Sequence, residues 1–271
     1  MAEQSRQKLL FFDIDGTLLA GGISGYVPDS TLRALRMAQE KGHYVLVNTG
    51  RTYSYMPTLM RKLPFDGYIC GCGTQIFLNG REIYRNIIPA NLRRNVISYF
   101  DQANLQGVFE GTNHCYFSPN TDNMVSYIAF IQDAYDKLSP TKTFDDQELD
   151  YDKFVILYDE NSDLPLFKEL IKEDFDFIDR GSIGEYGFAE IVPAGHSKAT
   201  GIDIVTKKLG LTLDDCYVFG DSTNDLPMLN HVKHSIAMGN SDPEVLKVTE
   251  YVTTPVNRDG IYLAMKHYNL I

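Results

Sequence analysis

Two short segments of the chain each place two aspartates in a loop at the end of an apolar run. Residues 13–17 read Asp-Ile-Asp-Gly-Thr and overlap the apolar run 9–14, and residues 220–225 read Gly-Asp-Ser-Thr-Asn-Asp after the run 216–219. Crowded carboxylates repel one another unless a cation or a chemical task offsets the repulsion. Hard oxygen ligands of this kind suit Mg²⁺. The alternative is two solvated turns, with Asp15 capping a helix in the first.

Two further segments carry groups that can bind an anion. Thr49 and Gly50 follow the apolar residues 44–47, and a hydroxyl and a backbone N–H at that place can hold phosphoryl oxygens. Lys198 is expected in the first turn of a helix, where free N–H groups already favour an anion. The alternative is that Lys198 is an ordinary surface lysine.

The elements that position these residues form an α/β pattern at both ends of the chain. Residues 9–14 and 44–47 read as buried strands joined by a helix from Asp29 or Ser30 to Gly42, which is a βαβ unit and predicts a parallel sheet. Near the other end, Ser197 can cap a helix that Gly210 closes, and strands follow at 216–219 and 235–238. Ligands bind at the carboxyl ends of such strands, so the two acidic loops are expected to meet there.

The middle of the chain has a different pattern. Strands at 154–158 and 175–178 mix with helices at 92–104 and 124–138, and the acidic run 144–150 is expected to be a solvated loop. The simplest organisation is one α/β domain interrupted by an inserted α+β domain. We place the first part of the core at residues 1–81, the insert at 82–188 and the second part of the core at 189–271.

Composition restricts the classes of partner. The chain has 271 residues and a formal net charge of −11, which argues against nucleic-acid and anionic-membrane binding, because both need a basic field. Residues 1–8 are polar, and no run approaches the ~18 apolar residues of a membrane span. The four cysteines show no zinc-like spacing, so we expect reduced, structural thiols in a cytoplasmic protein.

Taken in order, these motifs resemble those of the haloacid dehalogenase-like (HAD) superfamily. The segment 13–17, Thr49, Lys198 and the segment 220–225 match its four motifs, and 226–229, 237–240 and 257–260 resemble its Cof-type phosphatases. The resemblance implies a Rossmann-like parallel-sheet core with an inserted α+β cap of type IIB. One departure is Cys72-Gly73, where the group usually has Asn-Gly.

The resemblance also implies a mechanism and a cofactor. Asp13 is implied as the nucleophile that forms an aspartyl phosphate, and Asp15 as the general acid and base. The implied Mg²⁺ site and phosphate site draw on two further sets of residues. The metal set is Asp13, the backbone carbonyl of Asp15, Asp221, and Ser222 and Asp225 beside them; the phosphate set is Ile14, Thr49, Gly50, Lys198 and Asn224.

The same resemblance suggests what the protein acts on. We expect a Mg²⁺-dependent phosphatase of small phosphorylated metabolites, with sugar phosphates first and FMN or pyridoxal phosphate as other candidates, and we expect a monomer. Arg51 and His114 are possible substrate contacts, although His114 can equally be a plain loop histidine. The alternatives are a phosphosugar mutase-like phosphotransferase and a non-catalytic module that binds a phosphoryl ligand.

Overall fold

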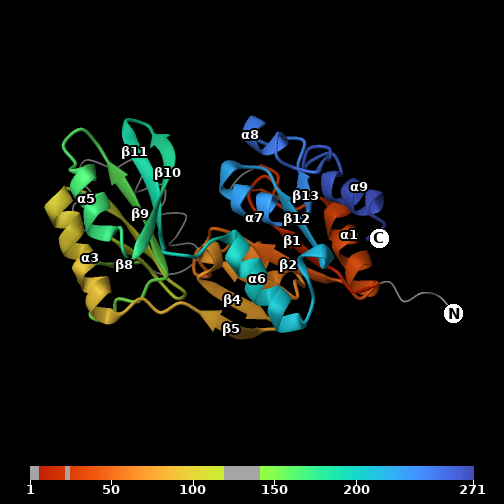
Figure 1. The fold of residues 1–271 in the computed structure, drawn as a ribbon, viewed down its shortest axis with the longest axis horizontal. Helices are drawn as coiled ribbons and strands as arrows, with labels where there is room; N and C mark the ends of the chain where they lie inside the picture. The colour runs from red at the N-terminus through yellow and green to blue at the C-terminus, as the bar shows by residue number, and fades with distance from the viewer. Residues whose placement is uncertain (1–5, 22–24, 119–140) are drawn as a thin grey trace. The chain divides into compact units, whose positions relative to one another are not determined.

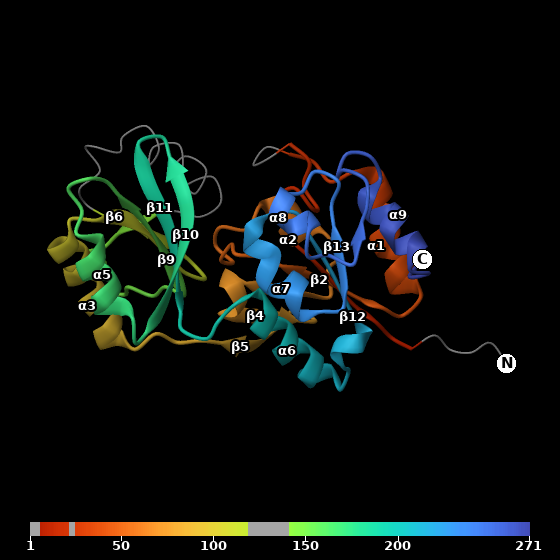
Figure 2. The ribbon, with the colours of Figure 1, turned by 45° about the horizontal axis from the view of Figure 1, so that its top comes forward.

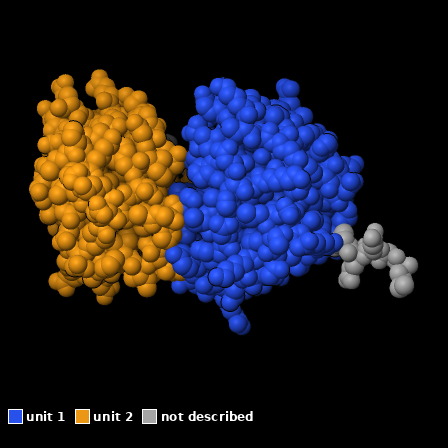
Figure 3. Space-filling model, viewed as in Figure 1, with its two compact units in different colours: residues 1–50, 64–84, 197–271 blue, residues 51–63, 85–196 orange. Residues whose placement is uncertain are grey.

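A computed structural model describes residues 6–21, 25–118 and 141–271 of the chain (Figure 1). These residues form two compact units, which Figure 3 distinguishes by colour. Unit 1 comprises residues 1–50, 64–84 and 197–271, and unit 2 comprises residues 51–63 and 85–196. The mixed α/β organisation predicted from the sequence is confirmed. The domain limits at residues 82 and 188 stay a prediction.

Unit 1 is built on a largely parallel sheet. In the described residues its strand order is β14-β13-β12-β1-β2-β3-β4-β5. Neighbouring strands from β14 to β3 run parallel, and β4 is antiparallel to β3. The strands are β1 (Leu9–Phe12), β2 (Tyr44–Asn48), β3 (Gly67–Cys70), β4 (Gln75–Leu78), β5 (Arg81–Arg85), β12 (Cys216–Gly220), β13 (His234–Ala237) and β14 (Tyr251–Val252).

Helices cover both faces of this sheet, as an apolar strand buried on two sides requires. In Figures 1 and 2, α6 (Lys198–Leu209) and α7 (Leu226–His231) lie together on one side of the sheet. On the other side lie α1 (Asp29–Glu40) and α9 (Gly260–His267), which contact each other. Shorter helical segments complete the unit: α8 (Pro243–Leu246), η2 (Gly71–Gly73), η3 (Leu213–Asp215) and η4 (Thr223–Asp225).

The predicted βαβ unit is confirmed, with one correction at the end of its first strand. The predicted helix begins at Asp29, and the second strand is β2. The first strand ends at Phe12, however, two residues earlier than the run 9–14 predicts. The reason is a tight turn, because the carbonyl of Ile14 accepts hydrogen bonds from the N–H groups of Leu18 and Leu19 at 3.0 and 2.8 Å. Asp13 therefore lies directly after β1 at the carboxyl edge of the sheet, where its N–H still donates to the carbonyl of Phe219.

Unit 2 is an α+β unit with an aromatic core. In the part of the chain that the structure describes, its sheet has the order β10-β11-β9-β6-β7-β8, and phenylalanines such as Phe100, Phe109 and Phe154 pack into one cluster. The predicted helix at 124–138 lies outside the described residues. The elements are α2 (Thr58–Lys62), α3 (Ala90–Ala103), β6 (Gln106–Glu110), β7 (Cys115–Phe117), β8 (Lys142–Thr143), β9 (Lys153–Tyr158), α5 (Leu164–Ile171), β10 (Phe175–Ile183) and β11 (Tyr186–Pro193).

The acidic run 144–150 is a loop, as predicted, but it is anchored at both ends. Phe144 and Leu149 are buried in the aromatic core of unit 2. The carboxylate of Asp150 pairs with the guanidinium groups of Arg85 and Arg93. Only the residues between these anchors are solvated. The apolar side chain near each end of the run is buried because its removal from water is favourable in free energy.

Two negative findings concern the described residues of both units. Cys70, Cys72, Cys115 and Cys216 are all buried and form no disulfide, which agrees with the prediction of reduced thiols. Across residues 6–21, 25–118 and 141–271, no helix combines the length and apolar character of a membrane span.

Unit 2 contains a buried cluster of four charged side chains. The Nζ atom of Lys153 lies 2.8 Å from Glu110 Oε2 and 2.5 Å from Glu190 Oε1, and Arg180 binds the other oxygen of Glu190. Burial alone would raise the pKa of Glu190, but Lys153 and Arg180 outweigh it and lower that pKa from 4.5 to about 2. The charges balance, so the cluster is stable only with all its members present.

We predict that Lys153→Met lowers the free energy of unfolding by about 3 kcal/mol at pH 7, because it removes the ammonium that both buried carboxylates contact and leaves Arg180 to compensate Glu190. The lowered pKa of Glu190 stabilises the fold above pH 4.5 in the parent, and this contribution disappears as the pH falls toward 2. The loss in the variant should therefore shrink at pH 3, as measured by urea unfolding. Lys172→Met, at an exposed Lys172–Glu169 pair, is the control and should change stability little at either pH.

Candidate active site

The predicted site residues of unit 1 come from the carboxyl ends of three adjacent parallel strands. Phe12 pairs with Val47 on one side and with Phe219 on the other, so β1, β2 and β12 end at the same level. Asp13 follows β1, Thr49 follows β2 and Asp221 follows β12. The N–H of Asp13 still donates to the carbonyl of Phe219 at 3.0 Å, which holds the first acidic loop to the second.

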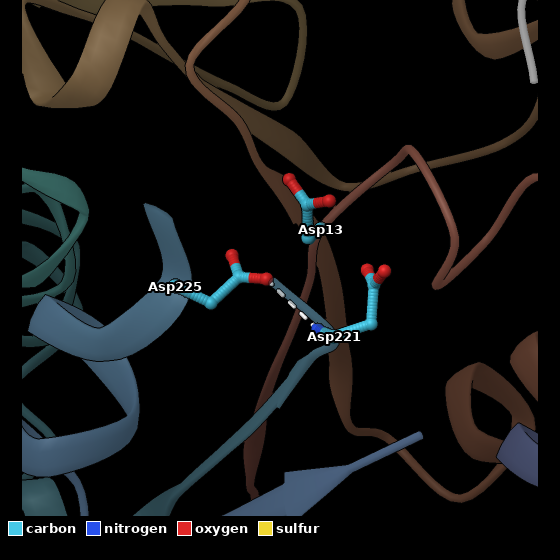
Figure 4. Close-up of side chains that lie close together, drawn as sticks. All are labelled: Asp13, Asp221 and Asp225. Carbon is cyan, nitrogen blue, oxygen red and sulfur yellow. Dashed lines mark hydrogen bonds between the residues drawn. The ribbon is translucent and has the colours of Figure 1, made fainter. Parts of the chain in front are cut away.

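Three carboxylates converge above this edge. One oxygen each from Asp13, Asp221 and Asp225 lies within 4.8 Å of the other two, and Figure 4 shows the side chains around a common space. The two acidic segments therefore meet, as the sequence predicts. The carboxylate of Asp15 is not part of this group of three.

Lys198 lies buried between two of these carboxylates. Its Nζ atom donates to Asp13 Oδ1 and to Asp225 Oδ1, at 2.6 Å in each case, and its side chain is 1% exposed. Lys198 is the first residue of α6, whose cap Ser197 accepts a hydrogen bond from the N–H of Thr200. The prediction that Lys198 begins a helix is confirmed, and the alternative of a surface lysine is wrong.

Asp225 is fully engaged by protein groups. Its Oδ1 accepts the bond from Lys198, and its Oδ2 accepts from the backbone N–H of Asp221 at 2.9 Å (Figure 4) and from that of Ser222 at 3.2 Å. These bonds shape the loop after β12 and fix the direction of the Asp221 side chain. Asp225 thus serves the site through its neighbours, whereas no hydrogen bond in the described chain reaches the Oδ2 atoms of Asp13 and Asp221.

The electrostatics of the cluster are unbalanced, because three carboxylates face one ammonium. Burial raises the pKa of Asp13 to about 8, and burial together with Asp225 raises the pKa of Asp221 to about 7. Burial alone would lower the pKa of Lys198, but Asp13 and Asp225 outweigh it, so that the pKa is raised and the lysine stays charged. A cation beside the free oxygens would lower the pKa of both aspartates, since it favours their ionised forms.

Two glycines make room for the carboxylates. A Cβ atom on Gly16 would lie 2.2 Å from Asp221 Oδ2, and one on Gly220 would lie 2.6 Å from Asp225 Cγ. Gly16 also has a φ of +82°, in the left-handed region that favours glycine. The glycine of each motif is therefore required by the close approach of an acidic side chain from the second loop.

The other residues predicted for phosphate and metal binding lie around this cluster, each with its own contacts. Thr49 is buried, and its carbonyl accepts from the N–H of Cys72 at 3.1 Å. Gly50 is half-buried and ends the first segment of unit 1, and Ile14 is buried in the turn after β1. The hydroxyl of Ser222 donates to Asn224 Oδ1 at 2.8 Å, so these two side chains are paired with each other.

The two possible substrate contacts belong to unit 2. Arg51 stacks over the ring of Tyr55, with its Cζ 4.5 Å from the centroid, and its Nη1 donates to the carbonyl of Tyr55 at 3.3 Å. His114 lies in the turn between β6 and β7, where its carbonyl accepts from the N–H of Gly111 at 3.0 Å. Neither observation tests a contact with substrate.

Three polar residues support the site without having been assigned a role from the sequence. Thr17 Oγ1 donates to Asp221 Oδ1 at 2.8 Å, and Asn48 Nδ2 donates to the carbonyl of Lys198 at 2.9 Å. Asn240 Nδ2 donates to the carbonyl of Gly16 at 2.9 Å. Thr17 and Asn240 lie within motifs that resemble those of the family, so a role for them at the site could have been predicted. The sequence around Asn48 does not indicate a role for it, because its partner Lys198 is 150 positions away.

Cys72, the departure from the usual Asn-Gly, has a φ of +57°. Asparagine is enriched in this left-handed region, so the family's usual residue fits the same turn with less strain. The next residue, Gly73, is essential for close packing, because a Cβ on it would lie 2.4 Å from the carbonyl oxygen of Ser197. The turn therefore keeps its shape with cysteine and still supports the start of α6.

The residues present fit a hard divalent cation. The Oδ2 atoms of Asp13 and Asp221 accept no hydrogen bond from the described chain, and both side chains belong to the cluster of three carboxylates. Mg²⁺ is held by one or two carboxylates plus waters and substrate oxygens. Asp13 and Asp221 offer such carboxylate oxygens, whereas both oxygens of Asp225 are bound by protein donors. The donor set contains no sulfur or imidazole, which argues against zinc.

Comparison with known proteins places the chain in a family. A haloacid dehalogenase-like hydrolase family profile matches residues 10–265. The 5-amino-6-(5-phospho-D-ribitylamino)uracil phosphatase YcsE of Bacillus subtilis is 28% identical over 263 residues, which cover 97% of this chain and 96% of YcsE.

Two solved structures extend the likeness to the fold. A protein of Geobacillus kaustophilus superposes with a TM-score of 0.83 at 28% identity, covering 98% of this chain and 100% of that one. The HAD subclass IIB sugar phosphatase BT4131 superposes with a TM-score of 0.77 at 28% identity, again covering 98% and 100% of the two chains.

The chain therefore belongs to the haloacid dehalogenase-like hydrolase family. Within it, the chain is a phosphatase, that is, a phosphoric monoester hydrolase, with the α/β fold of subclass IIB. The resemblance inferred from the four motifs is confirmed, and the non-catalytic alternative is set aside.

We predict that Gly16→Ala lowers the hydrolysis of p-nitrophenyl phosphate by about 100-fold, because the new Cβ displaces the carboxylate of Asp221. Gly42→Ala is a matched control, since Gly42 has a φ of +85° and nothing within 4 Å of the position of its Cβ. Both variants share the left-handed strain, about 1–2 kcal/mol, which thermal unfolding would report. Equal activity in the two variants would contradict the assigned role of the contact.

Proposed function

We propose that this phosphatase is Mg²⁺-dependent and hydrolyses small phosphorylated metabolites through an aspartyl phosphate on Asp13. The observation that carries the proposal is that the two oxygens of the Asp13 carboxylate have different surroundings. Its Oδ1 is held by Lys198 at 2.6 Å and its Oδ2 receives no hydrogen bond from the described chain, and the Asp13 side chain belongs to the carboxylate cluster with Asp221 and Asp225. One oxygen is oriented and the other is available to attack.

The proposed reaction has two chemical steps. An oxygen of Asp13 attacks phosphorus, the ester P–O bond breaks, and Asp15 gives a proton to the leaving alkoxide. A water oxygen then attacks phosphorus, Asp15 takes the proton of that water, and the P–O bond to Asp13 breaks to release inorganic phosphate. Asp15 is suited to this exchange because its carboxylate lies outside the group of three acidic side chains that share a cation site.

The proposed Mg²⁺ ligands are Asp13, the backbone carbonyl of Asp15 and Asp221, with Ser222 and Asp225 supporting them. When bound, Mg²⁺ supplies positive charge between an anionic nucleophile and an anionic phosphate. Asp225 contributes by holding the N–H of Asp221 and the ammonium of Lys198 in place.

The phosphoryl oxygens also need hydrogen-bond donors on the side away from the proposed Mg²⁺. We assign them to Thr49, Lys198 and Asn224 and to the N–H groups of Ile14 and Gly50. Lys198 is suited to this task because its burial leaves the ammonium largely without water, so its charge acts over a short distance at low dielectric. Its position in the first turn of α6 adds the helix N-terminus to the same anion site.

The leaving group is proposed to be small and polar, and sugar phosphates are the first expectation. The named relatives support this class, since BT4131 is a sugar phosphatase and YcsE acts on a phosphorylated ribityl compound. Selection of the leaving group is assigned to the cap, residues 82–188, with Arg51 and His114 as candidate contacts. A panel of phosphorylated sugars and cofactors, compared by kcat/KM, tests the class.

We predict that Asp13→Asn lowers turnover by about 10⁴-fold or more, because the amide cannot attack phosphorus. Rapid acid quench with ³²P-labelled substrate should trap one hydroxylamine-sensitive phosphate per active site in the parent protein and none in the variant. Binding of Mg²⁺ and phosphate together should persist in part, as isothermal titration calorimetry can measure.

Asp203→Asn is the control for this substitution, since Asp203 is 52% exposed and pairs with His231 on the surface. It should leave turnover unchanged. Near-normal turnover by Asp13→Asn would exclude Asp13 as the nucleophile. Label found on an acceptor sugar, with no inorganic phosphate released, would instead favour the mutase-like alternative.

We also predict that removal of metal abolishes activity. Treatment with EDTA followed by desalting should reduce p-nitrophenyl phosphate hydrolysis to background, because three carboxylates would otherwise face a phosphate dianion with only Lys198 to compensate. Addition of Mg²⁺ should restore the rate, and Ca²⁺ should restore much less, since it accepts longer and less regular coordination. Full activity in EDTA would contradict the proposed cofactor.

A further inference from the structure

We propose that the 238–242 segment, which follows β13, sets the distance between the two acidic loops and thereby tunes the cation site for Mg²⁺. Asn240 is the positioning residue in this proposal, since it reaches the first loop while its neighbours hold the second. The inference rests on the metal site of the proposed function and goes beyond it by naming what controls its dimensions.

The segment contacts the first acidic loop through a single side chain. Asn240 Nδ2 donates to the carbonyl of Gly16 at 2.9 Å. Gly16 is the residue whose Cα lies against the Asp221 carboxylate, and it directly follows Asp15, whose own carbonyl is a proposed metal ligand. A shift of the Gly16 peptide therefore moves the Asp15 carbonyl together with the backbone that lies against the Asp221 carboxylate.

The same segment makes four hydrogen bonds with the second acidic loop, one of them from Ser241 Oγ to the carbonyl of Gly220 at 3.4 Å. The N–H of Asp242 donates to the carbonyl of Asp221 at 2.8 Å, and Asp242 Oδ2 accepts from the N–H of Thr223 at 3.3 Å. The N–H of Met238 donates to the carbonyl of Gly220 at 3.1 Å. The segment is thus bonded to residues on both sides of the Asp221 side chain.

The segment is itself held from behind by the loop after β14. Asn240 Oδ1 accepts from the N–H of Val256 at 2.9 Å, and the N–H of Gly239 donates to the carbonyl of Thr254 at 3.2 Å. A Cβ on Gly239 would lie 2.6 Å from Pro255, so this contact is close. The Asn240 side chain is therefore fixed at its oxygen and can hold Gly16 with its nitrogen.

The spacing between the loops matters more for Mg²⁺ than for larger cations. Mg²⁺ requires near-octahedral ligands at about 2.0–2.1 Å, whereas Ca²⁺ accepts 2.3–2.6 Å in flexible geometry. Asn240 is exposed and adds little to the core, so its loss should affect the cation site far more than the fold. Loss of selectivity for Mg²⁺ is the signature that a purely structural role would not produce.

The test measures cation binding without turnover. Thermal unfolding of the full-length, metal-free protein is followed over a range of Mg²⁺ or Ca²⁺ concentrations, and the concentration dependence of Tm gives an apparent Kd for each ion. Asn240→Ala removes both bonds. Asn240→Asp keeps the acceptor for Val256 and removes the donor to Gly16, and its added negative charge alone would strengthen cation binding. Asn95→Ala, at an exposed position on α3, is the matched control.

We expect both Asn240 variants to bind Mg²⁺ about 5- to 10-fold more weakly and Ca²⁺ no more weakly than the parent does, with the Tm of the metal-free protein close to that of the parent. Parent-like Mg²⁺ binding by Asn240→Asp would overturn the role of the Gly16 bond, and an equal loss for both ions would overturn the control of spacing. Asp221→Asn separates the two proposals. If the parent shows no stabilisation by Mg²⁺, or if Asp221→Asn retains it, the metal site fails and the role of Asn240 fails with it.

Discussion

The ammonium group of Lys198, buried between Asp13 and Asp225, is the interaction on which the rest of the site depends. A charge removed from water costs several kcal/mol unless partners compensate it, and both partners here lie at 2.6 Å. Each partner comes from a different loop, one after β1 and one after β12. The sheet register, the start of α6 and the turn at Gly73 must therefore all be correct for this one lysine to be stable.

Comparison of the two buried ionic clusters explains why one is structural and the other chemical. In unit 2, Lys153 and Arg180 face Glu110 and Glu190, so the charges balance and nothing further is required. In unit 1, one lysine faces three aspartates. Burial raises the pKa of Asp13 and Asp221, the carboxylate of Asp225 raises both further, and the excess negative charge favours a cation. With the proposed cation added to Lys198, the site could hold an anionic substrate although the chain has a net charge of −11.

Much of the fold and the site could be predicted because the signals are local. The apolar runs, Ser197, Gly210 and the glycine beside each acidic pair are read within a few residues, and the structure has strands, a capped helix and close approaches at those places. Prediction from the sequence failed for features that depend on contacts with a distant part of the chain. Asp13 leaves β1 early because of a turn, the run 144–150 is anchored by Arg85 and Arg93, and Asn48 is explained only by Lys198.

The sequence by itself determined which residue types stand at the ends of the strands, and with them the family, the reaction class and the hard-oxygen character of the site. Only the tertiary structure decided how the carboxylates divide their tasks. Asp225 uses both of its oxygens for protein donors, whereas Asp13 and Asp221 each keep one available. The four motifs carry no such information, because a hydrogen bond depends on where two distant segments meet in space, and that meeting is set by the packing of the whole sheet and its helices.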